Sequence, residues 1–415
     1  MVGQLSLMAV LPVLTRAFGP AALGEYQVAT AIAMTLQPLA TLRVEFVLPA
    51  TRYSANARRL YRTGVLAILV VAAVAIAVGI VLAVVGGGSG VSVSMMSAAL
   101  MAAFGLTVVD NARLIRSGQL KLLARRNLIS GLLAAGLQIV TVLVGGSILF
   151  AAFSILAARL ISMAMTRGRG FARERVEAGD EDTPYTIRRI IPSIVSGVTA
   201  TATSQSFVIT SGALGAGSAA FVGVAQRAAG APLTLIGQGL GQVVQSRLAP
   251  VVRARRPDLA RLVRRQILIL GTCSLAIAAA IIVGAPILAE PLLGEGWGAA
   301  GDIAALLAIP MAFQLVVGPL MPVLPMLARE RLLAKLQIWR LVGTALVLAL
   351  SLGMGIGLVG ATIAFGAVTV AGYVVMLVIV LAETRKYDRS CHESFMALDI
   401  AQTNIRSMEL CNDGD

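Results

Sequence analysis

Histidine, cysteine and long hydrophilic segments are scarce in this chain, and each scarcity argues against a class of function. The 415 residues include one histidine and three cysteines. Cys273 lies in an apolar stretch, whereas Cys391 and Cys411 lie near the C-terminal end, so no disulfide framework is visible. The single histidine, His392, has only Cys391 beside it, which favours a solvated pair over a metal site. We therefore expect no metal and no other cofactor.

The chain also lacks the polar segments in which membrane-bound enzymes hold their catalytic groups. A membrane polymerase, ligase or glycosyltransferase needs a substantial hydrophilic segment with acids, bases or a nucleophile, and none is visible. The absence of a GxxxxGK(S/T) phosphate-binding loop argues against nucleotide-driven pumping. The sequence therefore predicts a protein that is not an enzyme and has no catalytic residue.

Apolar residues dominate what is present. The chain is 58% hydrophobic and 13% charged, and its long apolar runs are typical of transmembrane helices. The sequence predicts an all-α polytopic membrane protein with about 12 transmembrane helices. The predicted spans are 1–14, 23–50, 63–87, 91–112, 127–145, 147–166, 187–212, 217–246, 266–289, 301–328, 332–353 and 356–382. At ~1.5 Å per residue the first is too short to cross, so we expect an incomplete first helix.

The positions of the basic residues provide an independent test of this topology. All but four of the 34 lysines and arginines lie in alternate loops and in the C-terminal tail; the four are Arg16, Arg43, Arg159 and Arg227. The intervening loops are short and rich in glycine. By the positive-inside rule, both termini are cytoplasmic and the number of spans is even. The net charge of +14 then indicates contact with anionic lipid headgroups rather than with nucleic acid.

Two long spans correspond to each other in the two halves of the chain. Each contains an interrupting proline, Pro38 in 23–50 and Pro232 in 217–246, and each ends in an arginine-rich loop. Corresponding broken helices in two repeats point to a central binding site in transporters. With six spans per half, the halves would be related by an axis along the membrane normal.

A third span, 301–328, carries four prolines, among them Pro310 and Pro319. Prolines kink or interrupt helices. We expect this span either to bend during alternating access or to be permanently kinked.

Three stretches resemble the signatures of polysaccharide flippases. The first is LPVLTRAFGPAALGEYQVATAIAMTLQPLATLRVEFVLP, in which a loop of Arg-x-Phe-Gly-Pro type precedes a Gly-x-Tyr helix start and an Arg-x-Glu motif at Arg43 and Glu45. The second, FVGVAQRAAGAPLTLIGQGLGQVV, resembles the signature of helix 8 and contains Gln226 and Arg227. The third, LLGEGWGAAG, resembles the loop before helix 10. Val44 departs from the aromatic residue that the family often has within its Arg-x-Glu motif.

The resemblance implies a member of the multidrug, oligosaccharidyl-lipid and polysaccharide exporter superfamily, with two six-helix lobes around a central cavity. The implied parts are an N-terminal lobe (1–166), a cytoplasmic linker (167–186), a C-terminal lobe (187–384) and a cytoplasmic tail (385–415). Such flippases move an undecaprenyl-diphosphate-linked oligosaccharide to the outer leaflet of the bacterial inner membrane, for example for lipopolysaccharide O-antigen or exopolysaccharide. The polysaccharide polymerase and assembly proteins are further expected partners, beside the anionic lipids that the basic loops indicate.

Three arginines are candidates for binding the diphosphate, because a guanidinium binds phosphate through several donors at once. Arg227 is the deepest, ~15 Å from the outer end of its span. It lines the cavity, or it caps carbonyls freed by Pro232 or pairs with an acid. Arg43 lines the cavity or reaches the headgroups. Arg159 lies two turns from the cytoplasmic end of its span, which favours contact with the headgroups.

The remaining polar residues of the spans have weaker assignments. Glu45 lies two positions from Arg43, so a continuous helix would point the two in different directions. We expect Glu45 to have another partner, to be protonated or to take part in ion coupling. Gln226 and Gln242 bind sugar hydroxyls or link neighbouring helices. Asp110 is expected to form a surface ion pair with an arginine one turn further on.

Two other functions compete with the flippase. A multidrug or cation antiporter of the same superfamily should have acidic residues in its cavity, whereas the deepest charge here is the basic Arg227. A non-transporting membrane scaffold for polysaccharide assembly would not need an intramembrane arginine or paired broken helices. Charge reversal at Arg227 would abolish flipping of a lipid diphosphate and would leave a scaffold unaffected.

Overall fold

The computed structural model describes residues 9–50, 54–86, 89–165, 187–215, 217–253, 257–327 and 329–412, and every regular element in these ranges is a helix. The N-terminal helices are α2 (Leu11–Ala17), α3 (Pro20–Ala40), α4 (Val44–Val47), the 3-10 helix η1 (Leu48–Ala50), α5 (Ser54–Gly86), α6 (Ser89–Arg116), α7 (Leu120–Leu143) and α8 (Ile148–Ala164). The C-terminal helices are α9 (Ile187–Ser211), η2 (Gly212–Leu214), α10 (Ser218–Arg253), α11 (Leu259–Leu293), α12 (Gly298–Val317), η3 (Gly318–Leu320), α13 (Val323–Met326), α14 (Glu330–Gly353) and α15 (Leu358–Asn412).

These helices follow the order of the predicted spans. When the short pieces α4, η1, η2, η3 and α13 are joined to their neighbours, the described residues form twelve consecutive helical segments. Several of them extend beyond the predicted spans into the basic loops: α5 begins at Ser54, α11 begins at Leu259 and α15 continues to Asn412. The all-helical class predicted from the sequence is therefore confirmed.

The outer surface of the bundle is apolar. Within the described ranges, α5, α6, α7, α11, α12 with α13, α14 and α15 give seven helices that are long and apolar enough to cross a membrane. Large apolar side chains on these helices face outward; Leu66, Val81 and Leu275 are 61%, 61% and 71% exposed. Soluble proteins rarely expose so much apolar surface, whereas a lipid bilayer accommodates it. The chain is a multi-pass membrane protein.

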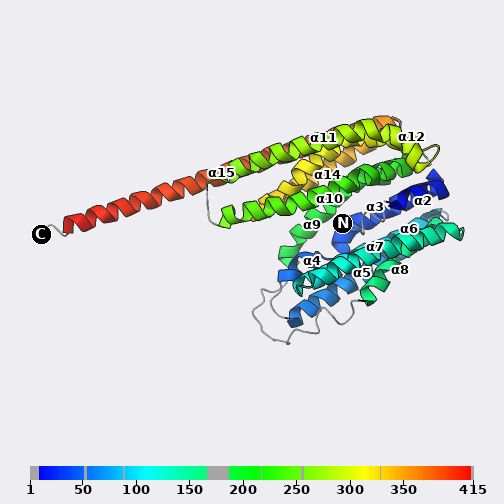
Figure 1. The fold of residues 1–415 in the computed structure, drawn as a ribbon, viewed down its shortest axis with the longest axis horizontal. Coiled ribbons are helices and arrows are strands. Elements are labelled where there is room, and N and C mark those ends of the chain that lie inside the picture. The colour runs from blue at the N-terminus through cyan, green and yellow to red at the C-terminus, as the bar shows by residue number, and fades with distance from the viewer. Residues whose placement is uncertain are drawn as a thin grey trace.

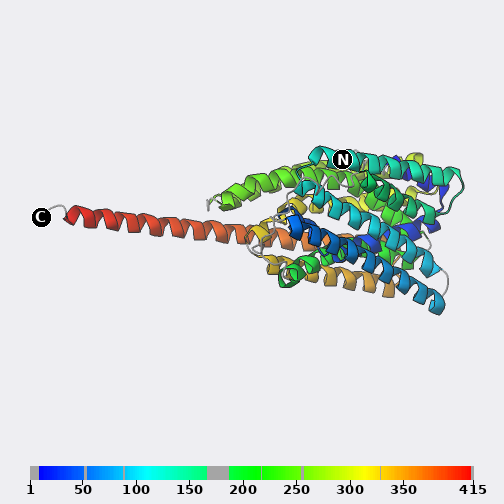
Figure 2. The same ribbon diagram turned by 90° about the horizontal axis from the view of Figure 1, so that it is seen from below.

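The two ends of the bundle differ in composition. We call one end the basic end, because the termini of α5, α6, α7, α11 and α14 carry arginine there. We call the other end the glycine end, because its turns contain Gly145, Gly215, Gly294 and Gly355 with positive φ. In Figures 1 and 2 the last part of α15 projects far beyond the basic end.

The helices form two groups. In the first, α3 packs against α6, α5 against α6 and α7 against α8; in the second, α11 packs against α12, α10 against α12 and α14 against α15. The groups meet where α3 packs against α9 and α10, and Figure 1 shows α9 between them. We propose that these groups are the lobes predicted at 1–166 and 187–384. Residues 1–8 of the first predicted span and the whole of the predicted linker, 167–186, lie outside the described residues.

The break in the segment predicted at 23–50 lies after Pro38 rather than at it. Pro38 is inside α3, which continues to Ala40. Leu42 and Arg43 then have φ values of 48° and 54°, a left-handed conformation that is costly for residues other than glycine. Proline removes one N–H donor, but the next turn still closes, because the Thr41 N–H donates to the Gln37 carbonyl at 2.9 Å.

The other predicted proline breaks differ among themselves. α10 is continuous through Pro232, so the expected interruption of this helix does not occur; a helix that loses a single hydrogen bond can persist. α12 likewise continues through Pro310 and ends at Val317. Pro319 lies in η3, where the segment changes from α12 to α13.

At the basic end, α15 is attached to the start of α11. The Asp388 carboxylate accepts hydrogen bonds from the Leu259 and Ala260 backbone N–H groups, both at 2.9 Å. A carboxylate at this position satisfies free donors of the first turn and opposes the positive end of the helix dipole. Nearby, Glu383 forms ion pairs with Arg329 at 3.1 Å and with Lys386 at 2.8 Å.

Candidate functional site

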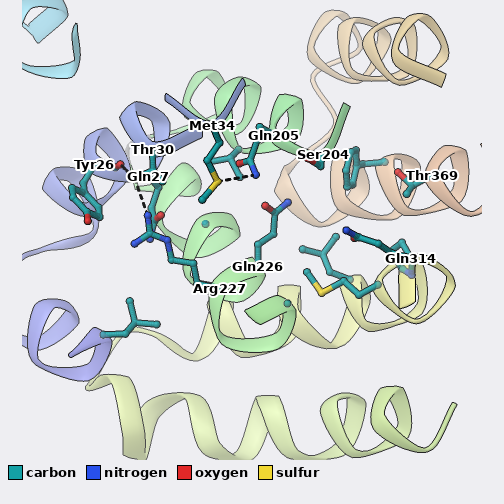
Figure 3. Close-up of a pocket in the computed structure, with 18 of the residues that line it drawn as sticks. Tyr26, Gln27, Thr30, Met34, Ser204, Gln205, Gln226, Arg227, Gln314 and Thr369 are labelled. Atoms are coloured by element: carbon teal, nitrogen blue, oxygen red, sulfur yellow. Dashed lines mark hydrogen bonds between the residues drawn. The ribbon is translucent and has the colours of Figure 1, made fainter. Parts of the chain in front are cut away.

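A central cavity of about 470 Å³ lies where the two groups of helices meet. Its described lining comes mainly from α3, α9, α10, α12 and α15, with Arg340 from α14, and Figure 3 shows ten of the lining residues with labels. Arg227 and Arg340 are part of this lining. The described lining includes no aspartate, glutamate, lysine or histidine. The cavity therefore carries positive charge without an acidic residue of its own.

Arg227 lies at the seam between α10 and α3. Its Nη2 donates a hydrogen bond of 2.8 Å to the Thr30 Oγ1, and its Cζ lies 5.0 Å from the centre of the Tyr26 ring. The Thr30 hydroxyl in turn donates to the Tyr26 carbonyl at 2.7 Å. In the described part of the chain Arg227 forms no ion pair, so the alternative of an acidic partner finds no support. The predicted position of Arg227 in the cavity agrees with this geometry.

Arg340 is a cavity residue that the sequence reasoning missed. Its assignment to the basic loop before its span is wrong, because it lies ten residues after Glu330, the start of α14. Ten residues of helix extend ~15 Å, so Arg340 lies well beyond the basic end of α14. The signal that could have identified Arg340 is its distance along the predicted helix from the start of that helix.

Amide side chains supply most of the remaining polarity of the cavity. Gln27, Gln138, Gln205, Gln226 and Gln314 all line it. Gln226 therefore lies where the sequence placed it, whereas the side chain of Gln242 lies outside the described residues. Amides donate and accept hydrogen bonds, as sugar hydroxyls do, so this lining suits a polar, uncharged ligand part beside an anionic one.

Arg43 and Glu45 pair with each other, which corrects the prediction that they point apart. Arg43 Nη1 lies 3.6 Å from Glu45 Oε1, and the two side chains are 22% and 13% exposed. The prediction assumed a continuous helix, whereas the left-handed backbone at Leu42 and Arg43 lies immediately before Glu45. Neither residue is part of the described cavity lining. Arg43 instead packs on Gly197 of α9, where an added Cβ would lie within 3 Å of its guanidinium.

Asp110 is placed differently from the prediction. It is fully buried between Arg113, whose Nη2 lies 2.7 Å from Asp110 Oδ1, and Arg126, so the pair is not at the surface. Arg159, which is half-buried, donates from its Nη1 to Ser130 Oγ on α7 at 2.7 Å. Three neighbouring helices each contribute to this buried network. These contacts depend on how neighbouring helices pack, so they could not be predicted from the spacing of residues along one helix.

Two contacts join the two groups of helices on the side of the glycine end. Gly223 allows α3 and α10 to approach closely, because an added Cβ there would lie 2.6 Å from Gln27 Cγ. A second contact joins α2 to the α11–α12 turn. There the Trp297 indole donates to the Thr15 carbonyl at 3.2 Å, and the Thr15 hydroxyl donates to the Leu293 carbonyl at 2.8 Å.

Comparison with known proteins places the chain in a family. Residues 13–302 match the family described as polysaccharide biosynthesis protein. This range is more than half of the 415 residues. No curated protein sequence matches the chain.

The solved structures with a similar fold include a flippase and two multidrug transporters. The first, lipid II flippase MurJ in an inward closed conformation, has a TM-score of 0.67 and 10% identity, over 96% of this chain and 90% of that chain. An inward-facing multidrug resistance MATE family transporter of the MOP superfamily has a TM-score of 0.64 and 16% identity, over 94% and 93% of the two chains. An outward-facing one has a TM-score of 0.54 and 16% identity, over 94% of each chain.

Because these sequence identities are low, the solved structures show only that the fold is shared. The family match, in contrast, is based on the amino-acid sequence. The two agree with the resemblance seen in the three signature stretches. The chain therefore belongs to the polysaccharide biosynthesis protein family and has the fold of the transporters of the MOP superfamily.

Proposed function

We propose that this protein flips a polyprenyl-diphosphate-linked oligosaccharide from the inner to the outer leaflet of the bacterial inner membrane, by alternating access, in the biosynthesis of a cell-surface polysaccharide. The observation that carries the proposal is Arg227, a guanidinium in an intramembrane cavity whose described lining offers it no carboxylate. Arg227 is half-buried, and a partly desolvated charge without an opposite charge is costly. A diphosphate would supply that charge, and guanidinium groups bind phosphate oxygens through several hydrogen bonds.

The rest of the cavity matches the other parts of such a substrate. The five glutamines of the lining provide donors and acceptors for sugar hydroxyls. The apolar outer surface of the bundle lies in lipid, where the polyprenyl chain of the substrate also belongs. One of the proteins with a similar fold is a lipid II flippase, which is consistent with a lipid-linked substrate here.

We infer that the structure represents the state that receives the substrate. The Gly223–Gln27 and Trp297–Thr15 contacts join the two groups on the side of the glycine end. The similarity to the inward-facing MATE transporter is higher than that to the outward-facing one, with TM-scores of 0.64 and 0.54. By the positive-inside rule, the basic end faces the cytoplasm, as do both termini, and its arginines contact anionic lipids there. Polysaccharide polymerase and assembly proteins would use the lipid-linked product.

The same cavity argues against a cation antiporter. A transporter of cationic compounds needs acidic groups in its binding site, and the described lining has none. A glycan flippase accounts for both the guanidinium and the amides, whereas a scaffold accounts for neither.

The test is translocation of a fluorescent polyprenyl-diphosphate oligosaccharide in liposomes, followed by protection from an external quencher. The wild type should translocate it, and Arg227→Glu should abolish translocation because the introduced carboxylate repels the diphosphate. Arg331→Glu is the matched control, since Arg331 is exposed at the start of α14. Wild-type protein that does not translocate the lipid, or equal activity of wild type and Arg227→Glu, would refute the proposal.

A further inference from the structure

The cavity contains a second guanidinium that the proposed function does not use. Arg227 is directed to Tyr26 on α3, whereas Arg340 is directed to Tyr373 on α15. Their helices, α10 and α14, both pack against α9, and α12 packs against both α10 and α15. In Figure 3, Arg227 lies beside α3, whereas Thr369, one turn before Tyr373 on α15, lies toward the other side of the view. The two arginines therefore belong to different walls of one cavity.

The neighbours of Arg340 fix its position. Its Nη2 donates to the Tyr373 hydroxyl at 3.1 Å, and its Cζ lies 4.2 Å from the centre of the Tyr373 ring. Its Nη1 donates to Gln337 Oε1 at 3.5 Å. Gly372 leaves room for the side chain, because an added Cβ there would lie 2.8 Å from Arg340 Cγ. A side chain held in this way needs little further ordering to bind a ligand.

No carboxylate neutralises Arg340 in the described part of the chain. None of the described acidic side chains lies within 4.0 Å of its nitrogens, and its Nε is buried without a hydrogen-bond partner. Tyrosine and glutamine orient the guanidinium but do not balance its charge. An anion in the cavity would remove this imbalance.

We propose that Arg340 binds a second anionic group, carried by the glycan, so that the substrate of this protein is an acidic lipid-linked oligosaccharide. The proposal rests on the flippase function proposed above, in which Arg227 binds the diphosphate. The two guanidiniums are held by different tyrosines on different helices, Tyr26 of α3 and Tyr373 of α15, so each is positioned to bind an anionic group of its own. The second group is a carboxylate or a phosphate on a sugar, since the guanidinium fork binds either.

The experiment compares three fluorescent lipids that differ only in the terminal sugar: glucose, glucuronic acid or glucose phosphate. Each is offered to the wild type, Arg340→Gln and Arg227→Gln in liposomes, and initial translocation rates are measured. The wild type should move at least one anionic lipid faster than the neutral one, and the faster of the two identifies the group. Arg340→Gln should slow that lipid by about 10-fold or more, the effect of losing a charge-assisted hydrogen bond, and change the neutral lipid less than twofold. Arg227→Gln should slow all three.

The outcomes separate this inference from the function on which it rests. If the wild type moves none of the three lipids, the flippase function fails and the inference fails with it. If the wild type moves them but Arg340→Gln changes all three by the same factor, or none, only the inference is overturned. A measurement that needs no variant guards against misfolding: detergent-solubilised wild type should bind the preferred anionic lipid about 10-fold more tightly than the neutral one, and equal affinities would also overturn the inference.

Discussion

Arg227 of α10 donates a 2.8 Å hydrogen bond to the hydroxyl of Thr30 on α3, across the boundary between the two groups of helices. The residue proposed to bind the diphosphate is therefore also part of the contact that holds the groups together. Binding of a phosphate by Arg227 would compete with this hydrogen bond. A phosphate bound at the Nη2 that donates to Thr30 would therefore weaken this contact between the groups.

Thr30→Val should remove this hydrogen bond while keeping the shape of the side chain. Because the mutation leaves Arg227 without a neutral acceptor, we expect a loss of about 1 kcal/mol in the free energy of unfolding, measured in detergent. Thr30→Ser retains the hydroxyl and is the matched control. A Thr30→Val protein as stable as the wild type would show that the bond does not hold the seam.

Gly223→Ala should open the glycine end. The added methyl group would lie 2.6 Å from Gln27 Cγ, so α3 and α10 must separate, at a cost of about 1 to 3 kcal/mol. The measurement is the distance between spin labels at Ala21 and Ala299, on a background in which the three cysteines are replaced by serine. We expect longer distances for Gly223→Ala. Gly136→Ala should leave the distances unchanged, because no atom lies within 4 Å of its added Cβ.

The Arg43–Glu45 ion pair should contribute measurable coupling in a double-mutant cycle. Both side chains are mostly buried, so removing one leaves the other poorly compensated, and we expect a coupling energy of about 1 kcal/mol between Arg43→Gln and Glu45→Gln. The Asp258–Arg261 pair has a similar distance, 3.7 Å, but its side chains are 53% and 88% exposed. It should show no measurable coupling. Equal coupling in the two cycles would contradict the role of burial.

Asp110→Asn should be among the most destabilising single substitutions of the N-terminal group. Asp110 is fully buried between Arg113 and Arg126, and its neutralisation leaves two buried guanidiniums without their carboxylate. We expect a loss of about 3 kcal/mol or more in the free energy of unfolding. The control is Asp258→Asn, which changes an exposed carboxylate. Unfolding curves of the two variants that coincide would disprove the expectation.

Hydrophobic runs and charge alternation were sufficient to predict most of the fold, because lipid forces apolar residues into long helices and basic residues into one set of loops. The same reasoning located Arg227, since its depth follows from counting residues along a helix. It misassigned Arg340 to the basic loop before α14, because Arg340 follows closely after the basic residues of that loop. It also misplaced the break in the second segment. A proline such as Pro38 is a recognisable signal for a helix break. The positive φ values of Leu42 and Arg43 depend instead on tertiary contacts, which a local sequence pattern does not reveal.

The hydrogen bonds from the start of α11 hold α15 at Asp388, and the rest of α15 projects beyond this point. Phe365, Thr369 and Tyr373 of this helix line the cavity, and Asp388 fixes a point further along the same continuous helix. From Asp388 to Asn412 the helix extends ~36 Å beyond that pivot. If α15 tilted by a few degrees about Asp388, its far tip would therefore move by a few ångströms. One continuous helix thus connects the lining of the cavity to the basic end of the bundle.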